Sequence, residues 1–526
     1  MKIVLKKAIN THVTVTNKKF KYTFFKPKKD LKGSKHLSCT TDRFIFLLIS
    51  SDNKKKQFKK FISNVILGKG QVLKSNLSNL DGIFQVFVHD KKENKTQVVS
   101  DALGIGSFYY LKKDDNSFIF FENFNNAEKL NTTLTISPLG LFSQLTFGYR
   151  VNPYPELYKE VSKIKASYKY TIHNTEIIEN KFHFLENKPN LKKAIKAFSK
   201  ESNKFKNVTV GITAGRDCLT ILSTLQKEKN IKLCNFGHEN SADVKQGKII
   251  SEELGVPFKN FKNVDNSNFL KLANHISSVS GGLCTLSYVD MANFASKIAS
   301  ESNYLMGEAG ACVRLLLDHN LSDKEQFDEY LTPATFVNKI INAKHKEFFL
   351  SERNQLLDLL ETTYYSDKSN PISISFYRNA RMPGNFGNRH KTLTAFSDKT
   401  SPFLAYDFMK HSYGLEKSNF SDDNLHLQII MNSNAELEKY FKDPLKKTTN
   451  TVQEWNLRFN EYVGAIYMDI IEENFEYLKE FFDKEQLIDL CKEQVDNPGR
   501  GIYFLHRVIS LLLFLSNFNN KTANVN

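Results

Sequence analysis

The residues with the clearest potential for chemistry lie in one stretch, residues 208–225, where an apolar strand pattern leads directly into Thr-Ala-Gly-Arg-Asp-Cys at 213–218. Small residues at such a turn let successive backbone N–H groups face one concavity, and a following helix adds the positive end of its dipole. A phosphate group is favoured at that place. Thr213 can add a hydroxyl donor, Arg216 a positive charge, and Asp217 a carboxylate that ligates Mg²⁺ or caps the helix.

The same turn also has a purely structural interpretation. In it, Gly215 makes the turn and Asp217 caps the helix, as in any strand–turn–helix unit. The turn is not of the Walker type, because GxxxxGK[ST] is absent. Both interpretations remain open from this turn alone.

The elements that must position these residues alternate in type from about residue 185. The pattern predicts helices at 191–198, 217–227 and 242–254, the last ending at Gly255, and strands at 207–212 and 232–236. Strand alternating with helix predicts a parallel sheet with right-handed crossovers, and ligands of such sheets lie outside the carboxyl ends of the strands. Beyond about residue 330 the chain is mainly helical, for example at 348–363 and 455–482.

Residues 1 to about 180 have a different pattern, with short runs rich in Val, Ile and Phe between Asp, Asn, Gly and Lys turns. Strands are predicted at 43–49, 83–89, 97–100, 108–111, 117–121, 168–172 and 176–182. Residues 90–94 and 112–116 have the composition of hairpin loops. The chain therefore predicts a β-rich N-terminal domain followed by an α/β domain with a helical C-terminal part.

Composition limits the classes of protein to which the chain can belong. The 526 residues carry a formal charge of +16, but the lysines are dispersed in short runs, so we expect a solvated surface and no nucleic-acid partner. The six cysteines form no CxxC pair, which is typical of free thiols in a reducing cytoplasm. The N-terminal sequence shows no export signal. The most apolar stretch, 501–518, contains His506 and Arg507 and predicts a buried helix and no membrane partner.

The turn at 213–218 resembles the pyrophosphate loop of the asparagine synthetase and ATP-pyrophosphatase group, usually Ser-Gly-Gly-x-Asp-Ser. The related form Thr-Ala-Gly-x-Asp-Ser-Arg fits Thr213, Ala214, Gly215 and Asp217. Cys218 and Leu219 stand where that form has Ser and Arg, and they depart from the pattern.

Three further segments match the family in chain order. Residues 80–90, 100–110 and 147–170 resemble the amidotransferase domain that precedes the synthetase domain, and Asp101, Gly104, Tyr109 and Tyr110 fit its Arg-Asp-x-x-Gly-x-x-x-Leu-Tyr-Tyr motif. In the family, glutaminase activity depends on a cysteine at the mature N-terminus. Lys2 follows Met1 here and no cysteine occurs before Cys39, so we expect no glutaminase activity.

Residues 305–316 resemble the Gly-Glu-Gly-Ala-Asp-Glu segment that contributes an acid to the metal–pyrophosphate site. Gly307 and Glu308 match, but Ala311 stands where the metal-binding acid is expected. Residues 376–415 resemble the late helix and loop of the family, with Arg381 in the Arg-Met pair. Arg389, His390 and Lys391 add cations there, although an arginine-rich loop is most often surface.

The resemblance implies an amidotransferase-like α+β sandwich at 1–184 and an ATP-pyrophosphatase-type domain of the adenine-nucleotide α-hydrolase type at 185–526. It implies an amide-forming ligase that uses ATP and Mg²⁺, with a small-molecule or peptide carboxylate as substrate and an amine or ammonia as donor. The implied catalytic residues are Asp217, Arg216 and Arg381, and the implied metal ligands are Asp217 and Glu308. The implied nucleotide-binding residues are Val210, Gly211, Thr213, Ala214, Gly215, Asp217, Cys218, Phe236, Gly307 and Glu308.

Two other functions stay open. A catalytically degenerate homologue with a binding or structural role is favoured by Ala311 and Cys218, and opposed by the intact turn with Asp217. An adenylating enzyme acting on tRNA would use the positive charge, and the dispersed lysines oppose it. A homodimer through the C-terminal helices is also open.

Overall fold

The computed structural model describes most of the chain. It covers residues 6–7, 15–17, 20–24, 35–50, 55–77, 80, 82–106, 108–112, 118–122, 124, 133–151, 154–173, 176–182, 188–226, 229–298, 303–314, 339–364, 372–394, 399–445, 459–499 and 501–523.

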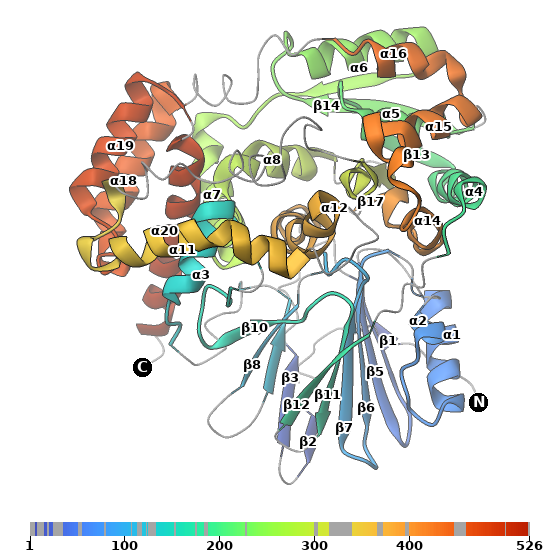
Figure 1. Cartoon of the computed structure of the whole chain (residues 1–526), viewed down its shortest axis with the longest axis horizontal. Coiled ribbons are helices and arrows are strands. Elements are labelled where there is room, and N and C mark those ends of the chain that lie inside the picture. Colours follow the sequence, from blue (N-terminus) through green and yellow to red (C-terminus); the bar gives the residue numbers. More distant parts are fainter. Residues whose placement is uncertain are drawn as a thin grey trace.

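Within these ranges, the N-terminal part contains two β-sheets that pack face to face (Figure 1). The first sheet has the order β1 (Lys6–Lys7), β4 (Lys35–Thr40), β5 (Phe44–Ser50), β6 (Phe84–Asp90), β7 (Lys95–Ser100), β11 (Tyr168–His173), β12 (Glu176–Lys181), and its neighbours are antiparallel. The second has the order β10 (Val161–Lys163), β8 (Tyr109–Lys112), β9 (Phe118–Phe121), β3 (Phe20–Phe24), β2 (Val15–Asn17), in which the pair β3–β9 is parallel.

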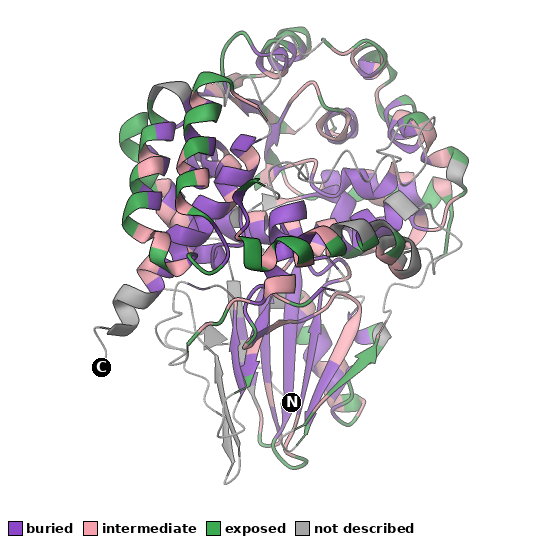
Figure 2. Cartoon of the chain, turned by 60° about the vertical axis from the view of Figure 1, so that its left-hand side comes forward, coloured by how far each residue is buried: buried purple, intermediate pink, exposed green. Residues whose placement is uncertain are grey.

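Strand β6 shows why these sequences form a sandwich. All of its residues are buried, because one face meets the second sheet and the other meets helix α1 (Lys55–Leu67). Figure 2 shows that much of the N-terminal sheet structure is buried in the same way. Phe87 packs against Phe108 and Phe120 of the opposite sheet, with ring centroids 4.9 and 5.5 Å apart. A strand buried on both faces is expected to be rich in apolar residues. Four of the seven residues of β6 are Phe or Val, and Gln85, His89 and Asp90 are buried polar residues.

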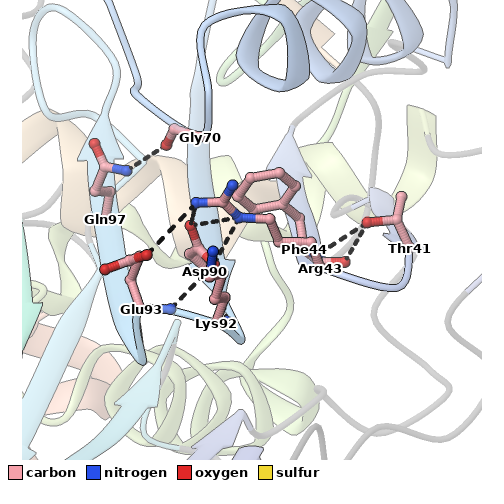
Figure 3. A network of polar contacts seen from close by, with 8 residues as sticks. All are labelled: Thr41, Arg43, Phe44, Gly70, Asp90, Lys92, Glu93 and Gln97. Atoms are coloured by element: carbon pink, nitrogen blue, oxygen red, sulfur yellow. Dashed lines mark hydrogen bonds and ion pairs between the residues drawn. The ribbon is translucent and has the colours of Figure 1, made fainter.

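An ion pair fixes the hairpin between β6 and β7. Arg43 donates from Nη2 to Asp90 Oδ2 at 2.6 Å, and the backbone N–H groups of Lys92 and Glu93 donate to Asp90 Oδ1 (Figure 3). This confirms the hairpin predicted at 90–94. The second predicted hairpin loop, at 112–116, falls almost wholly outside the described residues.

A third sheet follows, and its strands are all parallel. Its order is β15 (Phe258–Phe261), β14 (Asn230–Phe236), β13 (Asn207–Gly211), β16 (Asn303–Leu305), β17 (Lys399–Thr400). Helices α4 (Leu191–Ser202), α5 (Arg216–Ser223) and α6 (Ala242–Leu254) alternate with its first strands. Helix α6 ends at Gly255, whose φ of 62° is the left-handed geometry that glycine adopts readily. The predicted parallel sheet is confirmed.

Helices make up most of the remaining described chain. They are α2 (Lys74–Leu77), α3 (Pro138–Phe147), α7 (Asn266–Ser280), η2 (Leu286–Tyr288), α8 (Val289–Ile298), η3 (Gly310–Val313), α11 (Ala343–Tyr364), α12 (Ile372–Phe376), the π-helical η4 (Tyr377–Phe386), α13 (Gly387–Thr394), η5 (Pro402–Leu404), α14 (Tyr406–Ser412), η6 (Lys417–Asn419), η7 (Ser421–Asp423), α15 (Asn424–Ser433), η8 (Ala435–Leu437), α16 (Glu438–Lys442), the π-helical η9 (Phe459–Val463), α18 (Gly464–Asn474), η10 (Phe475–Tyr477), α19 (Lys484–Asp496) and α20 (Gly501–Ala523).

Three predicted elements differ from the structure. The helix at 217–227 ends earlier, at Ser223. The single helix at 455–482 is divided, because Asn474 leaves helical geometry with φ −123° and ψ 7°, and residues 455–458 lie outside the described chain. The arginine-rich loop of 376–415 is helical through α12, η4 and α13, and Arg378, His390 and Lys391 are buried.

Helix α20 is the one described helix that is long and apolar enough to cross a membrane, over Gly501–Phe518. In that window, 78% of the residues are buried inside the protein. Its Arg507 donates from Nη1 to the carbonyl of Leu145 in α3. The prediction of a buried C-terminal helix is therefore confirmed.

The N-terminal sheets and the helical part share core packing. Tyr158 donates its hydroxyl to the carbonyl of Gly281 at 2.6 Å, and Gln144 donates to the carbonyl of Leu283 at 3.0 Å. One apolar cluster includes Tyr109 and residues of α20. The boundary predicted between 184 and 185 stays a prediction.

Candidate functional site

The turn between β13 and α5 is closed by its own side chains and by α6. Thr213 Oγ1 accepts from the backbone N–H of Gly215 at 2.9 Å, and Asp243 of α6 accepts from the backbone N–H of Ala214 at 2.8 Å. Gly215 is the N-cap of α5 and its position has no side-chain cap. The carboxyl end of the central strand thus meets a helix N-terminus, the geometry that favours anions.

Asp217, in the first turn of α5, is enclosed by the segment that begins at Gly307. A Cβ atom built on Gly307 would lie 2.6 Å from Cβ of Asp217, and one built on Gly310 would lie 2.4 Å from its Cγ. Only glycine permits such close approach at these two positions. Ala309, between them, has φ 70°. The small residues of this segment are therefore needed for packing against Asp217.

A cavity of about 320 Å³ lies at this junction. Of the residues predicted from the sequence, it is lined by Gly211, Thr213, Gly215, Arg216, Asp217, Cys218, Phe236, Gly307 and Glu308. The structure therefore brings together most of the predicted residues from β13, α5, β14 and the loop after β16.

Three predicted residues are not among those that line the cavity in the described chain. Val210 is fully buried within β13. Ala214 is held against α6 through its N–H. Arg381 lies with its guanidinium 5.1 Å from the ring centroid of Tyr377. Instead of Arg381, Arg389 of α13 lines the cavity.

Two residues from distant parts of the chain contact Asp217. Nε2 of the buried His426 in α15 lies 3.0 Å from Asp217 Oδ1, and Nη1 of Arg314 lies 3.7 Å from the same oxygen. Helix α15 packs against α5 (Figure 1). Burial raises the pKa of Asp217, but the close contact of His426 and the charge of Arg314 outweigh it, so the net pKa is lowered. Asp217 is therefore held as a carboxylate.

Arg216 does not point freely into the cavity. Its Nη1 pairs with Oδ2 of Asp423, and its guanidinium lies 4.8 Å from the ring centroid of Phe441. Arg314 also approaches Asp423, at 3.9 Å. Asp423 thus lies between two arginines, with 8% of its side chain exposed.

Glu308 is buried and paired. Its Oε1 accepts from Nη2 of Arg389 at 3.1 Å, and its Oε2 lies 3.5 Å from Nδ1 of His390. Its carbonyl accepts from Ser401 Oγ at 2.5 Å. Burial lowers the pKa of Arg389, but the charge of Glu308 outweighs it and the net pKa is raised. Only 1% of the Glu308 side chain is exposed.

These carboxylates do not fit the Mg²⁺ site implied by the sequence. Mg²⁺ needs oxygen ligands near 2.1 Å in octahedral geometry. Asp217 is in contact with Arg314 and His426, Glu308 is in contact with Arg389, and Ala311 offers no donor side chain. In the described part of the chain, no group of three His, Cys, Asp or Glu side chains is placed to hold a metal.

The other side of the cavity is apolar. Phe236 stacks on Phe294 of α8, with ring centroids 5.1 Å apart, and Tyr304 meets Phe294 edge to face. A Cβ atom on Gly211 would lie 2.2 Å from the hydroxyl of Tyr304. An apolar wall beside a charged end is typical of small-molecule sites.

No sequence pattern indicates several of these contacts. His426 is a single histidine on an apolar helix. Asp243 and Asp423 are acidic residues at helix N-termini, where such residues are common. Arg314 is the exception, because it lies inside the segment 305–316 that resembles the family, as a cation three residues after Ala311.

Comparison with known protein families identifies a domain in the N-terminal part of the chain. Residues 64–183 match the family model for a glutamine amidotransferase domain. The chain contains an amidotransferase-like domain. No curated protein matched the sequence. Cys39, the cysteine nearest this domain, is buried in its core and burial raises the pKa of its thiol, so it is poorly suited to be a nucleophile.

Proposed function

We propose that the protein is an ATP-dependent amide-forming ligase of the asparagine synthetase type that lacks glutaminase activity. The observation that carries the proposal is the enclosure of Asp217 and the helix N-terminus by Gly307 and Gly310, at the edge of a cavity that is charged on one side and aromatic on the other. An amidotransferase-like domain precedes this unit in the chain. That domain order is the one implied by the sequence resemblance.

In the proposed reaction, a substrate carboxylate oxygen attacks the α-phosphorus of ATP. The bond from the α-phosphorus to the bridging oxygen breaks, and pyrophosphate leaves with that oxygen. An amine nitrogen then attacks the acyl carbon, AMP leaves with the former carboxylate oxygen, and the nitrogen loses a proton. The start of α5 and the arginines beside it stabilise the charge on the leaving pyrophosphate.

The aromatic wall gives the nucleotide its orientation. Phe236 and Phe294 present ring surface at the end of β14 that suits an adenine base. Asp217 does not act on the substrate directly in this proposal. It holds Arg314, which lines the cavity, and is itself held by the buried His426.

One observation favours a second candidate, a degenerate homologue that binds without catalysis. The backbone N–H of Ala214 and the guanidinium of Arg216 both have carboxylate partners within the chain, Asp243 and Asp423. Two groups expected to hold phosphate are therefore engaged elsewhere. This candidate predicts that no carboxylate supports release of pyrophosphate from ATP.

Calorimetric titration of the full chain with ATP tests the proposal, with and without MgCl₂. We expect micromolar binding to the wild type and about tenfold or weaker binding to Asp217→Asn, which keeps the side-chain shape but loses its charge. Exchange of labelled pyrophosphate into ATP, measured across a panel of carboxylates, then separates the two candidates. Absence of binding at millimolar ATP in both buffers would refute the ligase proposal.

A further inference from the structure

Three arginines from separate elements converge on the cavity. Arg216 begins α5, Arg314 follows η3, and Arg389 belongs to α13. Their side chains are 38%, 23% and 12% exposed. Guanidinium groups carry five N–H donors in a planar fork that matches phosphate oxygens.

The carboxylates that balance these arginines lie deeper than the arginines do. Asp423, the partner of Arg216, is 8% exposed, and Glu308, the partner of Arg389, is 1% exposed. Asp423 is also not among the residues that line the cavity, whereas all three arginines are. The charged residues that line the cavity are therefore three arginines and two carboxylates, Asp217 and Glu308, so the lining carries a net positive charge.

Two donors of these arginines are buried and have no hydrogen-bond partner in the described chain. They are the Nε atoms of Arg314 and Arg389. A buried donor without an acceptor is destabilising, and such groups are rare unless a ligand or water completes them. Both residues line the cavity, so an anion bound there is placed to accept from them.

Arg314 lies beside the carboxylate that would be expected to bind a metal ion. It lies 3.7 Å from Asp217, the carboxylate that is expected to hold Mg²⁺. A divalent cation between them would be repelled by the guanidinium at close range in a partly buried site. Ala311 stands where the sequence resemblance implies a second acid that would attract such a cation.

We propose that this cavity binds the polyphosphate of a nucleoside triphosphate as the metal-free anion, with Arg314 supplying the charge that a metal ion would otherwise supply. The inference rests on the proposed function, since it concerns the same cavity and nucleotide. Arg389 and Arg216 add further donors to the phosphate oxygens. Asp217 serves to hold Arg314 in position.

The test compares ATP affinity in EDTA and in MgCl₂, at constant ionic strength, for the wild type, Arg314→Met and Arg43→Met. Arg43→Met is the matched control, because it removes a guanidinium that is also paired with a carboxylate, Asp90, in the N-terminal sandwich (Figure 3). Calorimetry on the full chain gives the affinity, and urea denaturation confirms that each variant is folded.

We expect the wild type and Arg43→Met to bind ATP with affinities that agree within about threefold in the two buffers. In EDTA, Arg314→Met should bind about tenfold more weakly or worse. Adding MgCl₂ should restore part of that loss in Arg314→Met alone, because Asp217 then becomes accessible to the metal. A purely structural role of Arg314 would not produce this rescue.

Each other outcome overturns the inference. If EDTA weakens ATP binding to the wild type by about tenfold or more, a metal is required, and the proposed function stands without this inference. If Arg314→Met binds ATP in EDTA as well as the wild type does, Arg314 does not contact phosphate. If ATP binds in neither buffer, the proposed function fails and this inference fails with it.

Discussion

Replacing Gly310 by alanine tests whether the segment 307–311 positions Asp217. The new Cβ atom would lie 2.4 Å from Cγ and 2.5 Å from Oδ1 of Asp217. Non-bonded heavy atoms prefer about 3.5–4.0 Å, so the carboxylate must move by about 1 Å. Gly310 does not have positive φ, so the cost comes from this contact and not from the backbone.

The size of the effect follows from two terms. Overpacking costs about 1–3 kcal/mol. The displaced carboxylate also loses its 3.0 Å contact with the buried His426, and leaving a buried polar group without its partner costs about 1–3 kcal/mol. We expect the free energy of unfolding to fall by about 2–4 kcal/mol, with partial relaxation at the site. A shift of 1 Å should also weaken ATP binding by about tenfold or more.

Urea denaturation followed by circular dichroism measures the stability, and calorimetry measures the ATP affinity. Gly499→Ala is the matched control, because the nearest atom beyond its chain neighbours to the new Cβ would be Gln494 Oε1, at 3.6 Å. The reasoning is refuted if Gly310→Ala is no less stable than Gly499→Ala. Unchanged ATP affinity in a destabilised Gly310→Ala would show that Asp217 is not needed in its present position.

Three further predictions concern groups around the site and in the sandwich. Arg378→Met should lower the free energy of unfolding by about 2 kcal/mol in urea, because Arg378 donates from Nε and Nη2 to the carbonyl of Cys312; a change below about 0.5 kcal/mol would contradict this. Burial lowers the pKa of His89 to about 4, so the unfolded chain binds its proton first as the pH falls, and His89→Gln should reduce the loss of stability between about pH 6.5 and 4. Burial raises the pKa of Cys218 to about 12, so mass spectrometry should find it unmodified by iodoacetamide at pH 8 until urea unfolds the chain.

Much of the fold could be predicted from the sequence because local patterns and burial agree there. The run at 83–89 is rich in Ile, Val and Phe, and β6 is covered on both faces. The switch to alternating strand and helix near residue 185 correctly indicates the parallel sheet. Gly255 ends α6 as predicted, since its left-handed φ of 62° disfavours other residues.

The errors arose where tertiary packing overrides local preference. Residues 376–394 contain Pro383, Gly384 and Gly387, which favour a loop, yet they form helical turns. Gly384 lies against the side chain of Tyr149, so close that a Cβ atom would not fit there. A contact with a residue more than two hundred positions away cannot be recognised from the local sequence.

The site could be predicted only where its residues are neighbours in sequence. The turn at 213–218 and the segment at 307–311 carry recognisable patterns, and the structure places them together. His426 and Asp423 have no such pattern, because their proximity to Asp217 and Arg216 depends on how α15 packs against α5. The ionic partners of a site are therefore less predictable than the backbone that forms it.

The backbone at Asp422 and Asp423 connects these ionic partners to the proposed nucleotide binding. Both residues have left-handed geometry, with φ 50° and 55°, and each costs about 1–2 kcal/mol in that conformation. The ion pairs of Asp423 with Arg216 and Arg314 can offset that cost. If bound phosphate draws Arg216 into the cavity, Arg314 still lies 3.9 Å from Asp423. Because Asp423 is shared between two arginines, it can release Arg216 to a ligand and still be paired with Arg314. Phosphate can therefore bind through Arg216 at this site without leaving a buried carboxylate unpaired.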